Sequence, residues 1–293
     1  MSGFYIILTG SLVAMSCGIL GCFLILRKMA MVGDAISHAV LPGIVIAFLW
    51  SGSRDSVTML IGAGILGILT TFLIEFFTNK GKLQSDASIG VTFTWLFALG
   101  VILISAFTGQ VDLDQECVLY GEIAYVPLDT IVLASGLDIG PSAIYLLGTV
   151  FILVIAFIIL GFNQLKITTF DPQYAISLGI SATLWNYLLM SFVSFTTVAS
   201  FESVGAILVV AFLIAPAATA YLLTQDLKKM IILSCIIGIL SAIGGHFLAL
   251  SINGSIAGAM ASVAGVLFGI AFVYVRITSR KVAKITSAEP INA

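Results

Sequence analysis

An acid and an imidazole stand four residues apart beside a strongly apolar stretch of this sequence. The segment GDAISHAVLPG, residues 33–43, leads into the apolar run IVIAFLW at 44–50. On a helix, Asp34 and His38 would lie on one face, one turn or roughly 6 Å apart. Pro42 has no N–H, so the carbonyl of His38 would lose its helical partner. These donors suit Mn²⁺, Fe²⁺ or Zn²⁺, and Ser37 could support them through a hydrogen bond.

A structural role is the alternative for each member of this pair. Asp34 could cap a helix, and His38 could be a buried histidine whose ring is satisfied by its neighbours. Ionisable side chains inside membrane spans are costly, however, and usually line a pathway. Two donors do not complete a site, but a twofold axis would bring together two copies of Asp34 and two of His38. We therefore predict a divalent-cation site at a homodimer interface.

The other ionisable and helix-breaking candidates are few. His246, in GGHFLAL, is interpreted as a helix-packing residue, with a place on an ion pathway as the alternative. Glu202, in ASFESVG, is expected to cap a helix or to lie at the mouth of the pathway. Pro216, in LIAPAATA, and Pro42 are predicted hinges, because each removes a backbone hydrogen bond.

The composition requires a membrane. The chain has 293 residues, of which 60% are hydrophobic and 9% are charged, with a mean hydropathy of +1.19. An ordinary soluble domain has roughly 25% charged residues. The long apolar runs favour helices over a β-barrel. A net charge of −2 gives no basic patch for nucleic acid.

The hydropathy pattern predicts an all-α polytopic membrane protein with about nine transmembrane helices. A helix needs about 20 residues to cross the hydrocarbon core. The runs that qualify are 4–26, 34–50, 56–77, 87–107, 141–162, 184–200, 203–223, 230–250 and 256–275. If either of the short runs 34–50 and 184–200 is re-entrant or broken, the count falls to eight.

The basic residues predict the orientation of these spans. With the N-terminus outside, every Lys and Arg except Arg54 falls on the cytoplasmic side, which satisfies the positive-inside rule. Residues 1–276 then form one transmembrane permease domain, and 277–293 form a polar, frayed cytoplasmic tail. The acidic segment 108–140 becomes an extracytoplasmic loop that folds back onto the membrane interface. Lipid is the expected environment of the spans.

A short cytoplasmic helix is predicted in FDPQYAISLGI, residues 170–180. Asp171 suits the N-cap, Pro172 the first helical position, and Gly179 the stop. Its exposed apolar side chains, among them Tyr174 and Leu178, would need a partner in water, although a helix lying on the membrane is the alternative. The chain has no P-loop, since Gly81-Lys82 lacks the required glycine spacing. ATP hydrolysis would therefore require another polypeptide.

Five segments of the sequence, in order, resemble the permease subunits of metal-ion ABC importers, the ABC-3 family. They are MAMVGDAISHAVLPG at 29–43, DASIGVTFTWLFALGVILIS at 86–105, DLDQECVLYGEI at 112–123, FDPQYAISLGI at 170–180 and VGAILVVAFLIAPAATAYLLT at 204–224.

The resemblance implies a permease without its own ATPase site, in the bacterial cytoplasmic membrane and with the type II importer architecture. It implies a second copy of the chain, cytoplasmic ATP-binding subunits and an extracytoplasmic solute-binding protein as partners. It makes Asp34 and His38 the metal-binding pair. The segment that couples to the ATPase would contain Phe170, Asp171, Pro172, Tyr174, Leu178 and Gly179. It implies no permanently bound cofactor. The implied cargo is Mn²⁺, Zn²⁺ or Fe²⁺, and the sequence at 112–123 favours Mn²⁺.

The alternative is a stand-alone, ion-coupled secondary transporter of metal ions. Such proteins often contain inverted repeats and paired broken helices, and we find no clear internal repeat in the sequence. An intramembrane enzyme is disfavoured because no nucleophile stands near Asp34, His38 and His246.

Overall fold

The protein is a bundle of membrane-length helices. The structure, a computed structural model, describes residues 2–52, 56–107, 123–132 and 138–286. The longer helices are α1 (Ser2–Leu26), α4 (Ser56–Asn79), α5 (Ser85–Phe107), α7 (Ser142–Phe170), α9 (Ala182–Val204), α10 (Ala206–Leu223), α11 (Leu227–Ile252) and α12 (Ile256–Thr286). The short elements are α2 (Val32–Ala39), α3 (Leu41–Ser51), α8 (Pro172–Ser177), β1 (Thr130–Val132) and β2 (Asp138–Pro141).

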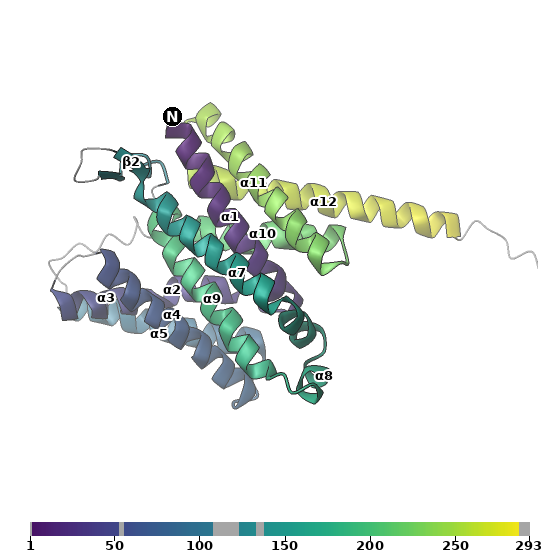
Figure 1. Ribbon diagram of the computed structural model, residues 1–293, viewed down its shortest axis with the longest axis horizontal. Helices are drawn as coiled ribbons and strands as arrows, with labels where there is room; N and C mark the ends of the chain where they lie inside the picture. Colours follow the sequence, from purple (N-terminus) through teal and green to yellow (C-terminus); the bar gives the residue numbers. More distant parts are fainter. Residues whose placement is uncertain (1, 53–55, 108–122, 133–137, 287–293) are drawn as a thin grey trace, which may run out of the picture.

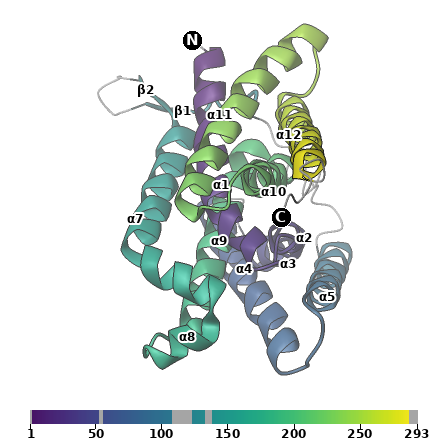
Figure 2. The same cartoon turned by 90° about the vertical axis from the view of Figure 1, so that its right-hand side faces the viewer.

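Within the described residues, nine helical segments are long and apolar enough to cross a membrane. The predicted all-α polytopic architecture with nine spans is confirmed. The N-terminus and β2 lie at one end of the bundle and α8 lies at the opposite end, as the views in Figures 1 and 2 both show. The short helix predicted at 170–180 therefore stands apart from the segment predicted to be extracytoplasmic.

Helix α1 is the centre of the bundle. It contacts α7, α9, α10 and α11, and Ala14, Cys17, Leu20 and Phe23 on it are fully buried. Small residues allow this close packing: a methyl group on Gly21 would lie 1.9 Å from the carbonyl oxygen of Leu213 on α10. Helix–helix association in lipid depends on such close backbone approaches.

The second span is broken into two helices. Helix α2 ends at Ala39 and α3 begins at Leu41, with Pro42 in its first turn. The N–H groups of Gly43 and Ile44 both donate to the carbonyl of Val40, at 2.9 and 3.1 Å. The break lies here because proline removes a donor and crowds the preceding turn. A break in either short span was expected to lower the count to eight. The two pieces together cover Val32–Ser51, 20 residues, so the count remains nine.

Helices α3 and α4 cross at a pair of glycines. A methyl group on Gly43 would lie 2.5 Å from the carbonyl oxygen of Gly62, and one on Gly62 would lie 2.5 Å from that of Gly43. Neither backbone can yield to a side chain at this crossing. The glycine pair therefore fixes the position of α3, and α2 precedes α3 directly.

Part of the predicted outer loop has regular structure. Strands β1 and β2 pair antiparallel, with Thr130 opposite Pro141, which the sequence analysis did not anticipate. Ile123 and Val126 are 2% and 6% exposed and belong to the main apolar core, so this part of the loop packs against the helices, and its contact with the membrane interface stays a prediction. Residues 108–122, which carry most of the loop's acids, lie outside the described residues.

The described part of the predicted tail is helical. Helix α12 continues to Thr286, past the apolar run predicted to end at 275, so residues 277–286 belong to this helix. The sequence RKVAKIT at 280–286 has no glycine or proline to stop the helix. Residues 287–293 lie outside the described part of the chain.

Candidate metal site

Helix α2 positions Asp34 and His38 by burying its opposite face. Ala35, Ile36 and Ala39 on that face are fully buried, and α2 contacts α4, α5, α9 and α10. The helical period leaves positions 34 and 38 on the remaining side. Burial of the apolar face therefore fixes the direction in which the acid and the imidazole point.

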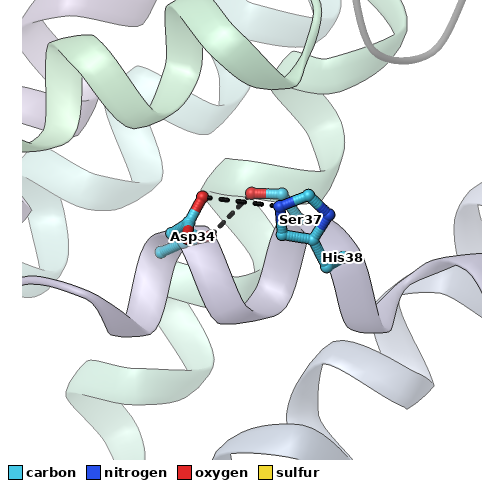
Figure 3. Close-up of polar contacts among 4 residues, drawn as sticks. Asp34, Ser37 and His38 are labelled. Atoms are coloured by element: carbon cyan, nitrogen blue, oxygen red, sulfur yellow. Dashed lines mark hydrogen bonds and ion pairs between the residues drawn. The ribbon is translucent and has the colours of Figure 1, made fainter. Parts of the chain in front are cut away.

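Asp34 and His38 lie side by side on one helical turn, as their spacing predicted. The Oδ1 atom of Asp34 lies 3.7 Å from Nε2 of His38, with the two side chains 35% and 39% exposed. Figure 3 shows both side chains on the same side of α2. The separation is too long for a good hydrogen bond. An ion bound by both side chains could approach from the open side.

The hydroxyl of Ser37 bonds to its own helix. It donates to the carbonyl of Gly33, 2.9 Å away (Figure 3). A serine hydroxyl often makes this backbone bond in a helix, and a supporting hydrogen bond from Ser37 to the metal donors stays a prediction.

Two aromatic rings on α5 pack against the imidazole. The His38 ring centroid lies 5.8 Å from that of Phe93 and 5.9 Å from that of Phe97, with the Phe97 ring edge-on. These contacts restrict the rotation of the histidine. Both phenylalanines lie within TFTWLF at 92–97, and no periodicity rule relates positions 93 and 97 to position 38, so their contact with His38 could not be predicted from the sequence.

Asp34 and His38 are a pair of donors and not a complete ligand set. No group of three or more His, Cys, Asp or Glu side chains able to hold a metal occurs among the described residues. Structural zinc has four ligands, and manganese is commonly bound by six donors. Further donors must be backbone carbonyl or other oxygen atoms of this chain, groups outside its described part, or the ion's own water.

The other candidate residues lie elsewhere. His246, on α11, is 6% exposed, and its Nδ1 has no hydrogen-bond partner among the described residues. A methyl group on Gly3 of α1 would lie 2.9 Å from its Nε2, which supports the packing interpretation. Glu202 belongs to the last turn of α9, so it does not begin a helix, and its side chain lies outside what the structure describes.

The two predicted hinge prolines differ in their surroundings. Pro42 follows the break between α2 and α3. Pro216 is buried, and α10 continues past it to Leu223 without a break. Motion at either proline stays a prediction.

The short helix α8 has the caps that the sequence predicted. It begins at Pro172, and the carboxylate of Asp171 accepts a hydrogen bond from the Tyr174 N–H at 2.9 Å. Gly179 has φ +75°, and its N–H donates to the carbonyl of Ile176 at 3.0 Å. Glycine takes this left-handed conformation without strain, which makes it a common helix stop.

Helix α8 carries large apolar side chains that the described residues leave uncovered. Phe170 just before it, and Tyr174, Ile176 and Leu178 within or after it, are all more than half exposed. Within the described part of the chain, α8 packs mainly on α7 and α9. The end of the bundle where α8 lies therefore presents a small apolar surface.

The fold and the site define a predominantly helical, polytopic membrane protein of the permease type, with an acid–imidazole pair on a broken span. The ABC 3 transport family model matches residues 4–275. The chain belongs to this family, which confirms the resemblance found in the sequence.

Named relatives agree with this assignment. The chain is 53% identical over 270 residues to the manganese transport system membrane protein MntD of Bacillus subtilis, covering 92% of this chain and 91% of that protein. It is 43% identical to the zinc transport system membrane protein TroD of Treponema pallidum, covering 92% and 73%. The solved structure of PsaBC from Streptococcus pneumoniae in complex with Fab superposes with a TM-score of 0.74 at 34% identity, covering 92% of this chain and 90% of that one.

Proposed function

We propose that this chain is the permease subunit of an ATP-driven importer of divalent transition-metal ions. Manganese is the favoured cargo, because the name of the relative at 53% identity specifies manganese. Zinc, named for TroD, and iron are the other ions that these donors suit. The ion is substrate, and transport needs no resident cofactor.

The observation that carries the proposal is the Asp34–His38 pair on α2. The two donor atoms lie 3.7 Å apart and remain partly open, so both could reach one ion. A carboxylate and a neutral imidazole are ligands of Mn²⁺, Zn²⁺ and Fe²⁺. Such polar groups inside a span are costly unless they serve a function.

We further propose that the site is completed by a second copy of the chain. A twofold axis beside α2 would place a second Asp34–His38 pair opposite the first. Four protein donors of mixed O and N type would then surround the ion, and water would fill any remaining positions. A transient site of this kind suits transport, because an ion that is bound too tightly is not released.

In the proposed orientation, the N-terminus is outside and α8 faces the cytoplasm of a bacterial cell. Residues 1–276 form the permease domain, and a solute-binding protein delivers the ion from outside. Cytoplasmic ATP-binding subunits cover the exposed apolar side chains of Tyr174, Ile176 and Leu178. ATP-driven movement of those subunits, transmitted through α8, opens the inner side of the pathway.

The site is tested by metal accumulation in cells that depend on this transporter. Asp34→Ala and His38→Ala should each reduce accumulation of the transported ion to background. Asp86→Ala, which removes an exposed acid at the start of α5, is the matched control and should transport normally. Wild-type accumulation in either site variant would refute the assignment, and elemental analysis of the wild-type cells ranks the three metals.

The coupling surface is tested by co-purification of the ATP-binding subunits. Tyr174→Glu and Leu178→Glu should abolish it while the permease remains folded. Gln173→Glu adds the same charge on the same helix without removing an apolar side chain, and it should retain the partner. Retained association in all three variants would refute this part of the proposal, as would ATP-independent uptake by the purified chain in vesicles.

A further inference from the structure

Arg27 forms a node between four helices at the end of the bundle that carries α8. It directly follows α1. Its Nε donates to Thr169 Oγ1 at 3.0 Å, one terminal nitrogen donates to Asn186 Oδ1 at 2.6 Å, and the other donates to Thr168 Oγ1 at 3.1 Å. Hydrogen bonds from a charged donor are stronger than neutral ones.

The acceptors of these bonds lie on both sides of α8. Thr168 and Thr169 are in the last turn of α7, just before Asp171 caps α8. Asn186 lies near the start of α9, which follows α8. One guanidinium therefore ties together the two stems that support α8.

The hydroxyl of Thr168 is oriented for this role. It donates to the carbonyl of Gln164 at 2.8 Å, which leaves its oxygen lone pairs directed toward other donors. Arg27 uses one of them. The bond is thus compatible with the helical hydrogen bonding of α7.

On its other side, Arg27 is joined to the metal-site helix by a short and ordered turn. The N–H of Met29 donates to the carbonyl of Leu24 at 2.9 Å, and that of Lys28 donates to Ile25 at 3.0 Å, with Lys28 at φ +60°. This is a Schellman cap at the end of α1. Helix α2 begins three residues later, at Val32, so little slack separates Arg27 from Asp34 and His38.

A buried acid on α4 contributes to the same node. Glu75 is 6% exposed, and its charge raises the pKa of Arg27, whereas burial lowers that pKa to about 10. The guanidinium remains protonated at neutral pH. Helix α4 also contacts α2 and α9, so this acid lies on a helix that packs against the same elements.

We propose that Arg27 is a positioning residue that transmits displacement of α8 to α2 and its Asp34–His38 pair. The inference rests on the proposed function and adds the path by which ATP-driven movement reaches the site. The planar fork of arginine can hold three acceptors at once, whereas the ammonium of lysine is a point charge on a flexible stem. Arg27→Lys therefore keeps the charge but loses the geometry.

The test uses the complete complex, with its ATP-binding subunits and binding protein, reconstituted in vesicles with Mn²⁺ as the probe. ATP hydrolysis and Mn²⁺ uptake are measured together. Arg27→Lys should keep the complex assembled and hydrolysing ATP, while Mn²⁺ delivered per ATP falls about fivefold or more, the lower end of typical coupling effects. Lys28→Gln, which changes the adjacent exposed cation, should leave this ratio unchanged.

Variants of the residues that accept hydrogen bonds from Arg27 provide a second test if the Arg27→Lys complex does not assemble. Thr168→Val and Asn186→Leu each remove an acceptor and should lower the uptake-to-hydrolysis ratio, whereas Asn186→Asp keeps an acceptor and should preserve it. A merely structural role would reduce uptake and hydrolysis in parallel, and that result, or an unchanged ratio, would overturn the inference. Failure of the wild-type complex to import Mn²⁺, Zn²⁺ or Fe²⁺ with ATP would instead refute the proposed function.

Discussion

Replacing Gly62 by alanine should destabilise the permease, whereas the same change two residues later should not. A methyl group on Gly62 would lie 2.5 Å from the carbonyl oxygen of Gly43 and 2.6 Å from the Cβ of Ala47. Ordinary contact begins at 3.4 Å, so α3 and α4 would have to separate by 0.9 Å at this crossing. A methyl group on Gly64 would meet nothing within 4 Å.

The magnitude follows from two opposing terms. Overpacking against a backbone that cannot move costs about 1–3 kcal/mol, and alanine in place of a helical glycine gains at most about 1 kcal/mol. Gly62→Ala should therefore lose up to about 2.5 kcal/mol. Gly64→Ala retains only the favourable term and should gain up to about 1 kcal/mol.

The assay is the thermal unfolding midpoint of the purified permease in detergent, measured for both variants and the wild type. We expect the midpoint to fall for Gly62→Ala and to stay level or rise for Gly64→Ala. Metal uptake should fall only for Gly62→Ala, because α3 directly follows α2, the helix that carries Asp34 and His38. Equal midpoints for the two variants would show that the α3–α4 crossing does not depend on the glycine contact.

Three further substitutions test the caps and the site. Asp171→Ala removes the α8 cap, which is worth about 0.5–2 kcal/mol of stability, and should weaken binding of the ATP-binding subunits in a pull-down. Asp226→Ala removes the cap of α11 and should leave that binding unchanged. Lys28 has a left-handed backbone conformation, which costs a non-glycine residue about 1–2 kcal/mol. Lys28→Gly removes this cost and should raise the unfolding midpoint, and a lower midpoint would contradict this. Phe97→Ala removes an aromatic contact of His38 worth about 0.5–1.5 kcal/mol. The Kd for Mn²⁺, measured by titration calorimetry, should therefore rise about two- to tenfold. An unchanged Kd would show that the ring does not orient the imidazole.

The features that depend on local rules could be predicted from the sequence. Asp171, Pro172 and Gly179 set the ends of α8 through capping and φ preferences that act within a few residues. The i, i+4 spacing placed Asp34 and His38 on one turn, where they are found. Hydropathy predicted the nine spans, because a chain in lipid must satisfy its backbone hydrogen bonds internally and a helix does so within one segment.

The features that depend on distant parts of the chain could not be predicted. The contact of Phe93 and Phe97 with His38 requires α5 to pack beside α2. Arg27 indicated only the orientation of the spans, because its acceptors lie on α7 and α9. In both cases helix packing, and not sequence spacing, brings the groups together.

The central position of α1 has a consequence for how the protein is made. This helix is synthesised before two of the helices that enclose it, α10 and α11, which begin only at Ala206 and Leu227. During translation α1 must therefore reside in lipid, which its mean hydropathy of 2.1 allows, before those helices enclose it. Its sequence has to suit lipid first and a protein interior later, and a nascent chain that stalls before α10 would leave α1 incompletely enclosed.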